Sequence, residues 1–437
     1  MQKISPKPAL YKPFLKRLIK TTPDPLSFLE YLLRNEDIVR LPMLRTNYIV
    51  NDPEAIHHVL LGNKDNYTKK GTGYEKIQRI MGKGLLTASG KEWVQRHKQF
   101  QPQFHGKPIT ECVPLIHKYT QAMLEKLQLK KGASINISQE MMSLAMNISS
   151  EALLGINISE HSLELVRKIH ILNDYAVRSS TLWKWLPTLK NLRFQSVKKE
   201  FNDFILTHIK NSLVTAHKPL LQSLLHKNSA GEFLLTDEAI LGEVNNFFVA
   251  GHETTGNALS WTLYNLIKNP YVLAKVQTEI KRNLGLNLPT AESLDKFAYL
   301  EMVISESLRL YPPIWIFTRR AINNDQLSNY TIAENSIVNI VPYFIHRHPA
   351  YWSQPNIFYP ERFSSEAVKS RPKCAYIPFG FGPRFCIGRQ FALLNMKIIL
   401  IMLLQRFVPH LPQADYQVKP ALLVTLKPSQ DIFLKLN

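Results

Sequence analysis

Cys386 is the residue whose surroundings in this 437-residue chain best suit metal chemistry. It follows a glycine-rich stretch, FGFGPRF at residues 379–385, and precedes an apolar run over residues 391–404 that predicts a helix. Amide groups at the start of a helix point toward such a sulfur atom, and the helix dipole favours negative charge there. Both effects lower the pKa of the thiol from its ordinary value of about 8.5. Because glycines let the backbone approach a bulky flat partner, the stretch predicts a thiolate that binds a soft metal.

The segment AGHETT, residues 250–255, is a second stretch with chemical potential. It lies in the middle of an apolar run, where start and stop signals predict a helix from about residue 237 to residue 268. Gly251 weakens the interior of a helix by up to about 1 kcal/mol, and threonines can bond back to carbonyl groups one turn earlier. A helix with such a weak point at its centre is a candidate functional site.

Two further patterns suit anion binding and core pairing. Trp93 and His97 are four residues apart, so both project from one helical face and can donate hydrogen bonds to the same anion. Arg96 lies beside His97 and is an alternative donor. Glu306 and Arg309 are three residues apart, which lets their charges pair on one helical face.

Taken in order, these motifs resemble those of the cytochrome P-450 superfamily, the haem-thiolate monooxygenases, of the soluble bacterial type without a fused reductase. The pattern Phe-x-x-Gly-x-Arg-x-Cys-x-Gly of the haem-binding loop is complete, with Phe379, Gly382, Arg384, Cys386 and Gly388. The segment PERF at 360–363 follows the Glu306–Arg309 pair at the family spacing. It implies a network of Glu306, Arg309 and Arg362 that fixes the core near the haem loop. The resemblance covers residues 35–430.

The resemblance implies a mostly α-helical fold with small β-sheets. It also implies a single haem domain over residues 1–437, with residues 1–35 as an N-terminal extension, and haem b with an axial cysteine thiolate as the cofactor. The periodicity of the apolar residues adds one helix over 135–155 and strands within 37–50, 331–341 and 422–426.

Most cofactor contacts follow from the resemblance. Cys386 is expected to be the metal ligand, Phe379 to pack near its sulfur, and Gly382 to permit the close approach of the loop. The residues expected to bind the haem propionates are Trp93, His97, Arg319 and Arg384, with Arg96 open as an alternative to His97 and Arg320 to Arg319. The remaining residues expected at the cofactor are Gly388, Ala250 and Gly251.

Catalysis is assigned by the same resemblance to Glu253 and Thr254, which we expect to deliver protons while dioxygen is activated. Asn246, Ala250 and Thr254 share one i, i+4 stripe, and we expect this stripe to face the haem. His252 lies on another face of the helix, where we expect a structural or solvent-facing role.

The expected reaction inserts one oxygen atom into a hydrophobic small molecule, either a fatty acid, a terpenoid or a steroid-like compound. The residues expected to line the substrate pocket are Leu86, Asn246, Phe247, Ala250, Ile314 and Ile316. Two alternatives stay open: a peroxide-dependent or non-oxidative haem-thiolate enzyme, and a non-enzymatic haem-thiolate ligand sensor. The pair of Glu253 and Thr254 argues against both.

A net charge of +20 and a pI of about 9.7 make the chain strongly basic. Such a charge attracts acidic proteins, anionic membrane surfaces or nucleic acid, and nucleic acid ranks last because no nucleic-acid motif accompanies the charge. We expect electrons to come from a separate ferredoxin or flavodoxin with its reductase. Three cysteines and no apolar run of about 18 residues predict a cytoplasmic protein without disulfides or a transmembrane segment. We expect a monomer, and peripheral membrane association stays open.

Overall fold

The structure is a computed structural model that describes residues 25–33, 36–41, 45–178, 188–212, 220, 224 and 235–437. It divides into two compact units, of which the first comprises Met1–Glu75 and Ser305–Cys386 and the second Lys76–Ile304 and Ile387–Asn437. The expected N-terminal extension therefore falls on described residues only where helix α2 (Pro25–Leu33) forms, and the rest of it lies outside them. Among the described residues, no helix has both the length and the apolar character needed to cross a membrane.

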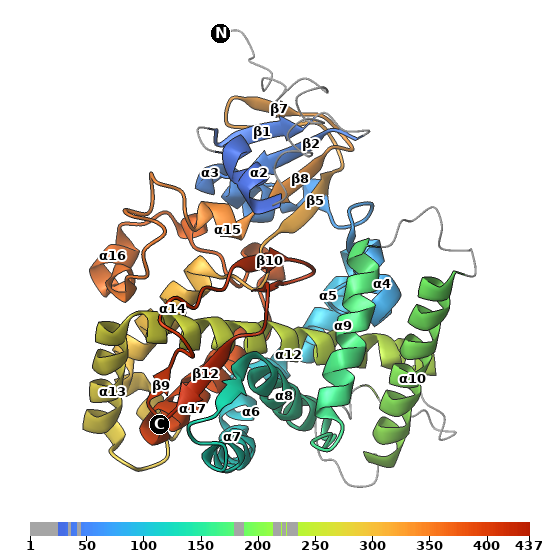
Figure 1. The fold of residues 1–437 in the computed structure, drawn as a ribbon. Coiled ribbons are helices and arrows are strands. Elements are labelled where there is room, and N and C mark those ends of the chain that lie inside the picture. Colours follow the sequence, from blue (N-terminus) through green and yellow to red (C-terminus); the bar gives the residue numbers. More distant parts are fainter. Residues whose placement is uncertain are drawn as a thin grey trace. The chain divides into compact units, whose positions relative to one another are not determined.

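A five-stranded sheet with the order β1-β2-β8-β5-β3 forms the centre of the first unit (Figure 1). Strands β2 and β8 run parallel, and the other neighbouring strands run antiparallel. The strands of this sheet are β1 (Ile38–Leu41), β2 (Asn47–Val50), β3 (Tyr67–Thr68), β5 (Phe317–Ala321) and β8 (Ile337–Ile340). A separate hairpin joins β6 (Asp325–Leu327) to β7 (Tyr330–Ile332). The strands predicted within 37–50 and 331–341 are confirmed.

Alternating burial explains why these segments form a sheet. In β5, Phe317, Arg319 and Ala321 are buried, while the two residues between them are partly exposed. Apolar side chains of the other strands, among them Val50 and Val338, are fully buried in the core of this unit. Removal of this apolar surface from water stabilises the sheet by about 25 cal/mol for each Å² buried.

Short helices and turns complete the first unit. They are α3 (Pro53–His57), α15 (Pro342–Ile345), α16 (Ser365–Lys369) and the turns η1 (His58–Gly62), η2 (Lys64–Asn66), η6 (Pro360–Phe363), η7 (Lys373–Ala375) and η8 (Gly382–Arg384). Two helices contain residues of both units, namely α4 (Tyr74–Met81) and α14 (Ala298–Leu310).

The second unit is mostly helical. Its helices and turns are α5 (Gly90–Phe100), η3 (Gln101–Phe104), α6 (Lys107–Thr110), α7 (Val113–Gln128), α8 (Ile137–Ser149), η4 (Ser150–Leu154), α9 (Ser162–Arg178), α10 (Leu189–Ser212), α12 (Asp237–Lys268), α13 (Pro270–Leu284), η5 (Glu292–Lys296) and α17 (Arg389–Arg406). Two small antiparallel sheets accompany them, β4 (Ser134–Asn136) with β12 (Phe433–Leu436) and β9 (Pro409–His410), and β10 (Pro420–Leu422) with β11 (Leu426–Pro428).

Helix α12 is the long central helix of this unit, and its bounds match the predicted range of 237–268 (Figure 1). Thr236 caps its first turn, because the Thr236 hydroxyl oxygen accepts a hydrogen bond of 3.2 Å from the amide of Ala239. Helix α8 packs closely against α12, and a Cβ atom at Gly251 would lie 2.9 Å from the Cβ of Ser149. The absence of a side chain at Gly251 therefore serves helix packing, and α12 continues through it unbroken.

Two predictions of local structure are wrong in part. The helix predicted over residues 135–155 is present over residues 137–154, where α8 continues into the π-helical turn η4, but residues 135 and 136 belong to strand β4. The strand predicted over residues 422–426 is instead a hairpin, in which β10 ends at Leu422, β11 begins at Leu426 and the residues between them form the turn. In both cases pairing with another strand, which periodicity does not reveal, determined which residues are in strands.

Candidate functional site

The loop before α17 presents the Cys386 side chain at an exposed position of the first unit. The Cys386 amide donates a hydrogen bond of 2.9 Å to the carbonyl of Phe379, and the Phe385 amide donates one of 3.0 Å to the carbonyl of Gly382. The rings of Phe379 and Phe385 lie 6.4 Å apart between their centroids. These contacts fold the loop back on itself and hold the thiol outward.

Gly382 permits this conformation for two physical reasons. Its φ angle is +73°, a value that side chains disfavour, and a Cβ atom there would lie 2.2 Å from the carbonyl oxygen of Leu60. Gly388 meets no comparable constraint, because a Cβ atom there would come no closer than 4.0 Å to the ring of Phe104.

Three cations of the first unit lie close enough to repel one another. Burial, and then the charges of Arg319 and Arg384, hold the pKa of the Lys69 ammonium well below its ordinary range. Burial and the charge of Arg319 lower the pKa of Arg384 to about 10. Lys69 and Arg319 are each only 8% exposed. A buried concentration of positive charge suits a ligand that carries carboxylates, since arginine binds these in a bidentate manner.

Arg320 is used differently from its neighbour Arg319. Its guanidinium donates hydrogen bonds of 2.8 Å to the carbonyl of Lys70 and of 2.6 Å to the side chain of Asn335. Arg320 therefore supports the segment after β3, whereas the alternation of β5 places Arg319 with Lys69 and Arg384. Lys69 was missed by the sequence analysis, because only burial distinguishes it from the exposed Lys70 next to it.

Glu306 forms ion pairs with two arginines of the same unit. Its carboxylate oxygens lie 2.6 and 2.8 Å from the guanidinium nitrogens of Arg309 and 3.3 Å from that of Arg362. Arg309 also donates hydrogen bonds of 2.8 and 2.7 Å to the carbonyls of His346 and Pro355. Removal of one member of such a buried network costs about 3–5 kcal/mol, because it leaves the partner charge unpaired.

Helix α5 of the second unit carries Trp93 and His97, whose rings lie 4.9 Å apart between their centroids. Arg96 does not share this contact between the rings. It forms ion pairs with Glu92 at 2.8 Å and with the buried Glu243 of α12. The side chain of Arg96 therefore ties α5 to α12, and Trp93 and His97 remain together on the adjacent face.

Helix α12 has one accessible patch in an otherwise buried run. Between Gly242 and Ile267, all residues are buried except Ala250, Gly251 and Thr254. The Thr254 hydroxyl donates a hydrogen bond of 2.7 Å to the carbonyl of Ala250, one turn earlier. A small side chain and an alcohol thus border this patch, whereas Asn246, the third residue of the expected stripe, is buried.

Asn246 and Phe247, both expected in the substrate pocket, contact residues within the second unit. The Asn246 side chain accepts a hydrogen bond of 3.0 Å from the amide of Leu86 and donates one of 2.6 Å to the carbonyl of Gly242. Phe247 is 6% exposed and packs against the rings of Phe100 and Phe104. Both side chains are therefore occupied in the interior of the second unit, whereas Leu86 is partly exposed.

The loop over residues 82–86 touches α12 through the backbone. A Cβ atom at Gly242 would lie 2.0 Å from the carbonyl oxygen of Lys83, so only glycine fits at this point. The amide of Leu85 donates a hydrogen bond of 2.9 Å to the carboxylate of Glu243. This backbone contact fixes the position of the loop, and of Leu86 on it, relative to α12.

Ile314 and Ile316, the other apolar residues expected in the pocket, belong to the first unit and are partly exposed. Glu253 and His252 of α12 are both buried. The Glu253 carboxylate binds Thr425 and Asn173. The Nδ1 of His252 lies 2.7 Å from the carbonyl of Phe248, which gives His252 a structural role and makes the solvent-facing alternative wrong.

A family model for cytochrome P450 matches residues 6–436. The chain belongs to the cytochrome P450 family. Cytochrome P450 4V2 of Homo sapiens is 28% identical to this cytochrome P450 over 100% of the chain and 90% of the relative. Cyclooctatin synthase of Streptomyces melanosporofaciens is 29% identical over 92% of the chain and 90% of the relative.

The haem domain of cytochrome P450DA, a solved structure, superposes on this cytochrome P450 with a TM-score of 0.85 at 25% identity. The superposition covers 96% of this chain and 94% of the solved chain, which confirms the mostly helical fold with small sheets. This cytochrome P450 is accordingly a monooxygenase, an oxidoreductase whose haem has a cysteine thiolate as axial ligand. As in the family generally, it requires dioxygen and a redox partner.

The residues of the first unit fit such a haem. An exposed thiol suits the iron, and the neighbouring cations Lys69, Arg319 and Arg384 suit the two carboxylates of the porphyrin. The donor set therefore matches both the metal and the acidic side chains of the cofactor.

Proposed function

We propose that this cytochrome P450 hydroxylates a hydrophobic small molecule, either a fatty acid, a terpenoid or a steroid-like compound, with electrons from a separate ferredoxin or flavodoxin. The supporting observation is the exposed thiol of Cys386, which occurs in the same unit as three mutually repelling cations. An iron porphyrin satisfies both features at once, because it offers a metal to the sulfur and carboxylates to the cations.

When it is bound, the haem supplies the iron chemistry that activates dioxygen. Cys386 supplies the thiolate, and Phe379 and Gly382 shape the loop that carries it. Lys69, Arg319 and Arg384 bind the propionates from the first unit. On α5, Trp93 and His97 are the candidate donors to a propionate, since Arg96 is committed to Glu243.

Glu253 and Thr254 provide protons in this proposal. Thr254 has an accessible position and a hydroxyl that already donates to the carbonyl of Ala250, so it can hold a proton donor in place. The short side chain of Ala250 leaves room beside it. Burial raises the pKa of the Glu253 carboxyl, which favours its protonated form and so its use as a proton donor.

The substrate class rests on apolar side chains that remain partly exposed. Leu86 of the second unit and Ile314 and Ile316 of the first are such residues. Apolar lining selects by the hydrophobic effect, so we expect binding to favour compounds with extended hydrocarbon surface.

The visible spectrum of the reduced protein with carbon monoxide tests this proposal. The native protein should give the strongly red-shifted Soret band of thiolate ligation. Cys386→Ser should lose this band, because the hydroxyl is a poor ligand for haem iron. Cys374→Ser is the matched control and should keep it, because Cys374 is buried and burial raises the pKa of its thiol to about 12. A normal band in Cys386→Ser would contradict the proposed ligand.

A further inference from the structure

Four glutamates among the described residues are at most 8% exposed, and Glu253 differs from the other three in its partners. Glu306 pairs with Arg309 and Arg362, and Glu243 pairs with Arg96. The fourth, Glu279, accepts hydrogen bonds of 2.8 and 2.9 Å from the backbone amides of residues 299 and 300. Cations and backbone amides only donate, so these partners favour the ionised carboxylate.

Glu253 is held by an alcohol and a side-chain amide. One carboxylate oxygen accepts a hydrogen bond of 2.7 Å from the Thr425 hydroxyl, and the other accepts one of 2.7 Å from the Asn173 side-chain amide. A hydroxyl and an amide can each donate or accept. They can therefore donate to a carboxylate and, after a rotation of the hydroxyl or the amide, accept from a carboxylic acid.

Residues around Glu253 can also accept a hydrogen bond from its protonated carboxyl. Asn173 is 5% exposed, and its carbonyl oxygen has no partner among the described residues, so it is able to accept from a protonated carboxyl. Asn257 donates a hydrogen bond of 3.3 Å to the oxygen of Thr425, which keeps the hydroxyl in place when its proton turns away.

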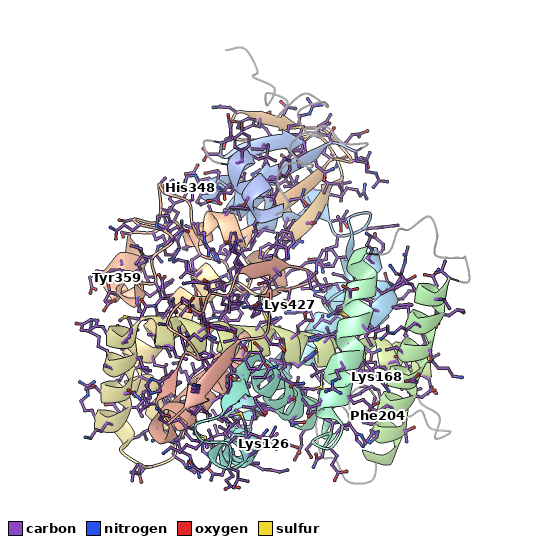
Figure 2. All side chains as sticks on the ribbon, in the orientation of Figure 1. Lys126, Lys168, Phe204, His348, Tyr359 and Lys427 are labelled. Atoms are coloured by element: carbon purple, nitrogen blue, oxygen red, sulfur yellow. The ribbon has the colours of Figure 1, made fainter. Side chains whose placement is uncertain are left out.

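Charged and titratable groups around Glu253 come from each element that surrounds it. Burial raises the pKa of Glu253, and the charge of Lys427 of β11, labelled in Figure 2, opposes this rise. No ion pair joins the two side chains in the described part of the chain. His252 on α12 and His170 on α9 have pKa values lowered to about 4, mainly by burial, so both are neutral near pH 7. Asp431 acts on His170. Glu253 differs from these histidines, because burial raises its pKa and so brings its protonated state toward higher pH.

We propose that Thr425 and Asn173 are positioning residues that hold Glu253 in both its protonated and its ionised state, so that it can store and release a proton without losing its place. The proposal rests on the proposed role of Glu253 as the acid beside Thr254. Release of the proton from the carboxyl leaves a carboxylate bonded to both partners. Uptake of one proton from solvent restores the acid, and no other bond is made or broken.

Infrared difference spectroscopy of the haem-loaded protein, recorded over a pH titration without turnover, tests this inference. The carbonyl band of the protonated carboxyl should titrate, and Glu253→Gln should remove it. Thr425→Val removes a hydrogen bond from both states, and the bond to the ionised carboxylate is the stronger of the two, so the midpoint should rise by about one to two pH units. Thr425→Ser keeps the hydroxyl and should restore the native midpoint, which a loss of packing alone would not explain.

Thr262→Val is the matched control, because Thr262 is a buried hydroxyl of α12 that bonds to the carbonyl of Ala258 and not to Glu253. Its midpoint should be native. If Thr425→Val fails to fold, Asn173→Leu should give the same upward shift. The inference would be overturned if the midpoint were unshifted in these variants or shifted equally in Thr262→Val. It would also be overturned if no titrating band depended on Glu253. The carbon monoxide spectrum tests Cys386 separately, so a failure of the proposed function can be distinguished from a failure of this inference.

Discussion

Lys69 illustrates how burial turns an ordinary lysine into a candidate ligand contact. Its ammonium lies 4.3 Å from the centroid of the Tyr74 ring, and its pKa is lowered by burial, Arg319 and Arg384. A bound carboxylate would raise this pKa again, because it offsets the repulsion between the cations. Lys69 should therefore take up a proton on haem binding at pH values between its pKa in the haem-free protein and its higher pKa in the haem-bound protein.

The expected consequence is a haem affinity that falls as pH rises through this window. Lys69→Met should weaken haem retention by about tenfold or more, the equivalent of a hydrogen bond to a charged group, and should flatten the pH dependence. Transfer of haem to an excess of an acceptor protein, followed over a pH series, measures both effects. Lys70→Met, at the exposed neighbouring position, serves as the control. A retained pH dependence in Lys69→Met would assign the proton to another group.

Individual site residues could be predicted from the sequence only to within near neighbours. Arg96 and His97, or Arg319 and Arg320, are adjacent, so spacing alone could not separate them. Ion pairs with Glu243 and hydrogen bonds to Lys70 and Asn335 occupy Arg96 and Arg320 in the structure. These partners are distant in sequence, and periodicity carries no information about them.

At the scale of elements, prediction succeeded where local signals decided the structure. Helix α12 matches its expected range because capping at Thr236 and a proline at 270 mark its ends. The short strand β4 and the hairpin of β10 and β11 depend on pairing between segments, and the predictions there were wrong. Strand formation in short segments is decided by tertiary context more than by residue preference.

The contact between α12 and residues 82–86 predicts a large cost for a single methyl group. Gly242→Ala would place a Cβ atom against the Lys83 carbonyl, and the backbone must shift to admit it. We expect a loss of about 1–3 kcal/mol in the free energy of unfolding by urea. Gly62→Ala is the control, because its nearest neighbour would lie at an ordinary 3.7 Å. An equal free energy of unfolding in the two variants would show that the loop over residues 82–86 shifts without cost to admit the methyl group.

At the scale of the whole molecule, the motifs divide between the two units. The cysteine loop, the three cations and the Glu306 network belong to the first, and the Glu253–Thr254 pair and the Trp93–His97 pair belong to the second. The chain passes between the units at residues 75–76, 304–305 and 386–387. The order of motifs along the sequence thus identified the family, although it did not reveal this division.

The net charge of +20 predicts that electron transfer from an acidic protein donor depends on salt. Raising the ionic strength from about 0.05 M to about 0.5 M should slow the second-order reduction rate by about tenfold, because salt screens exposed charges. Stopped-flow reduction by an acidic ferredoxin measures this rate. A small neutral reductant should show no such decrease, and an equal rate at both salt concentrations with the ferredoxin would argue against charge steering.

The fixed backbone contact between Gly242 and Lys83 has a consequence for anyone who wishes to change selectivity by directed evolution. Leu86 stands on a loop that cannot move independently of α12, so substitution there alters the size of a side chain against a rigid support. Libraries that vary Leu86 together with Ala250 should yield graded changes in the shape of accepted compounds. Libraries that vary Gly242 or Gly84 should instead be dominated by unfolded clones.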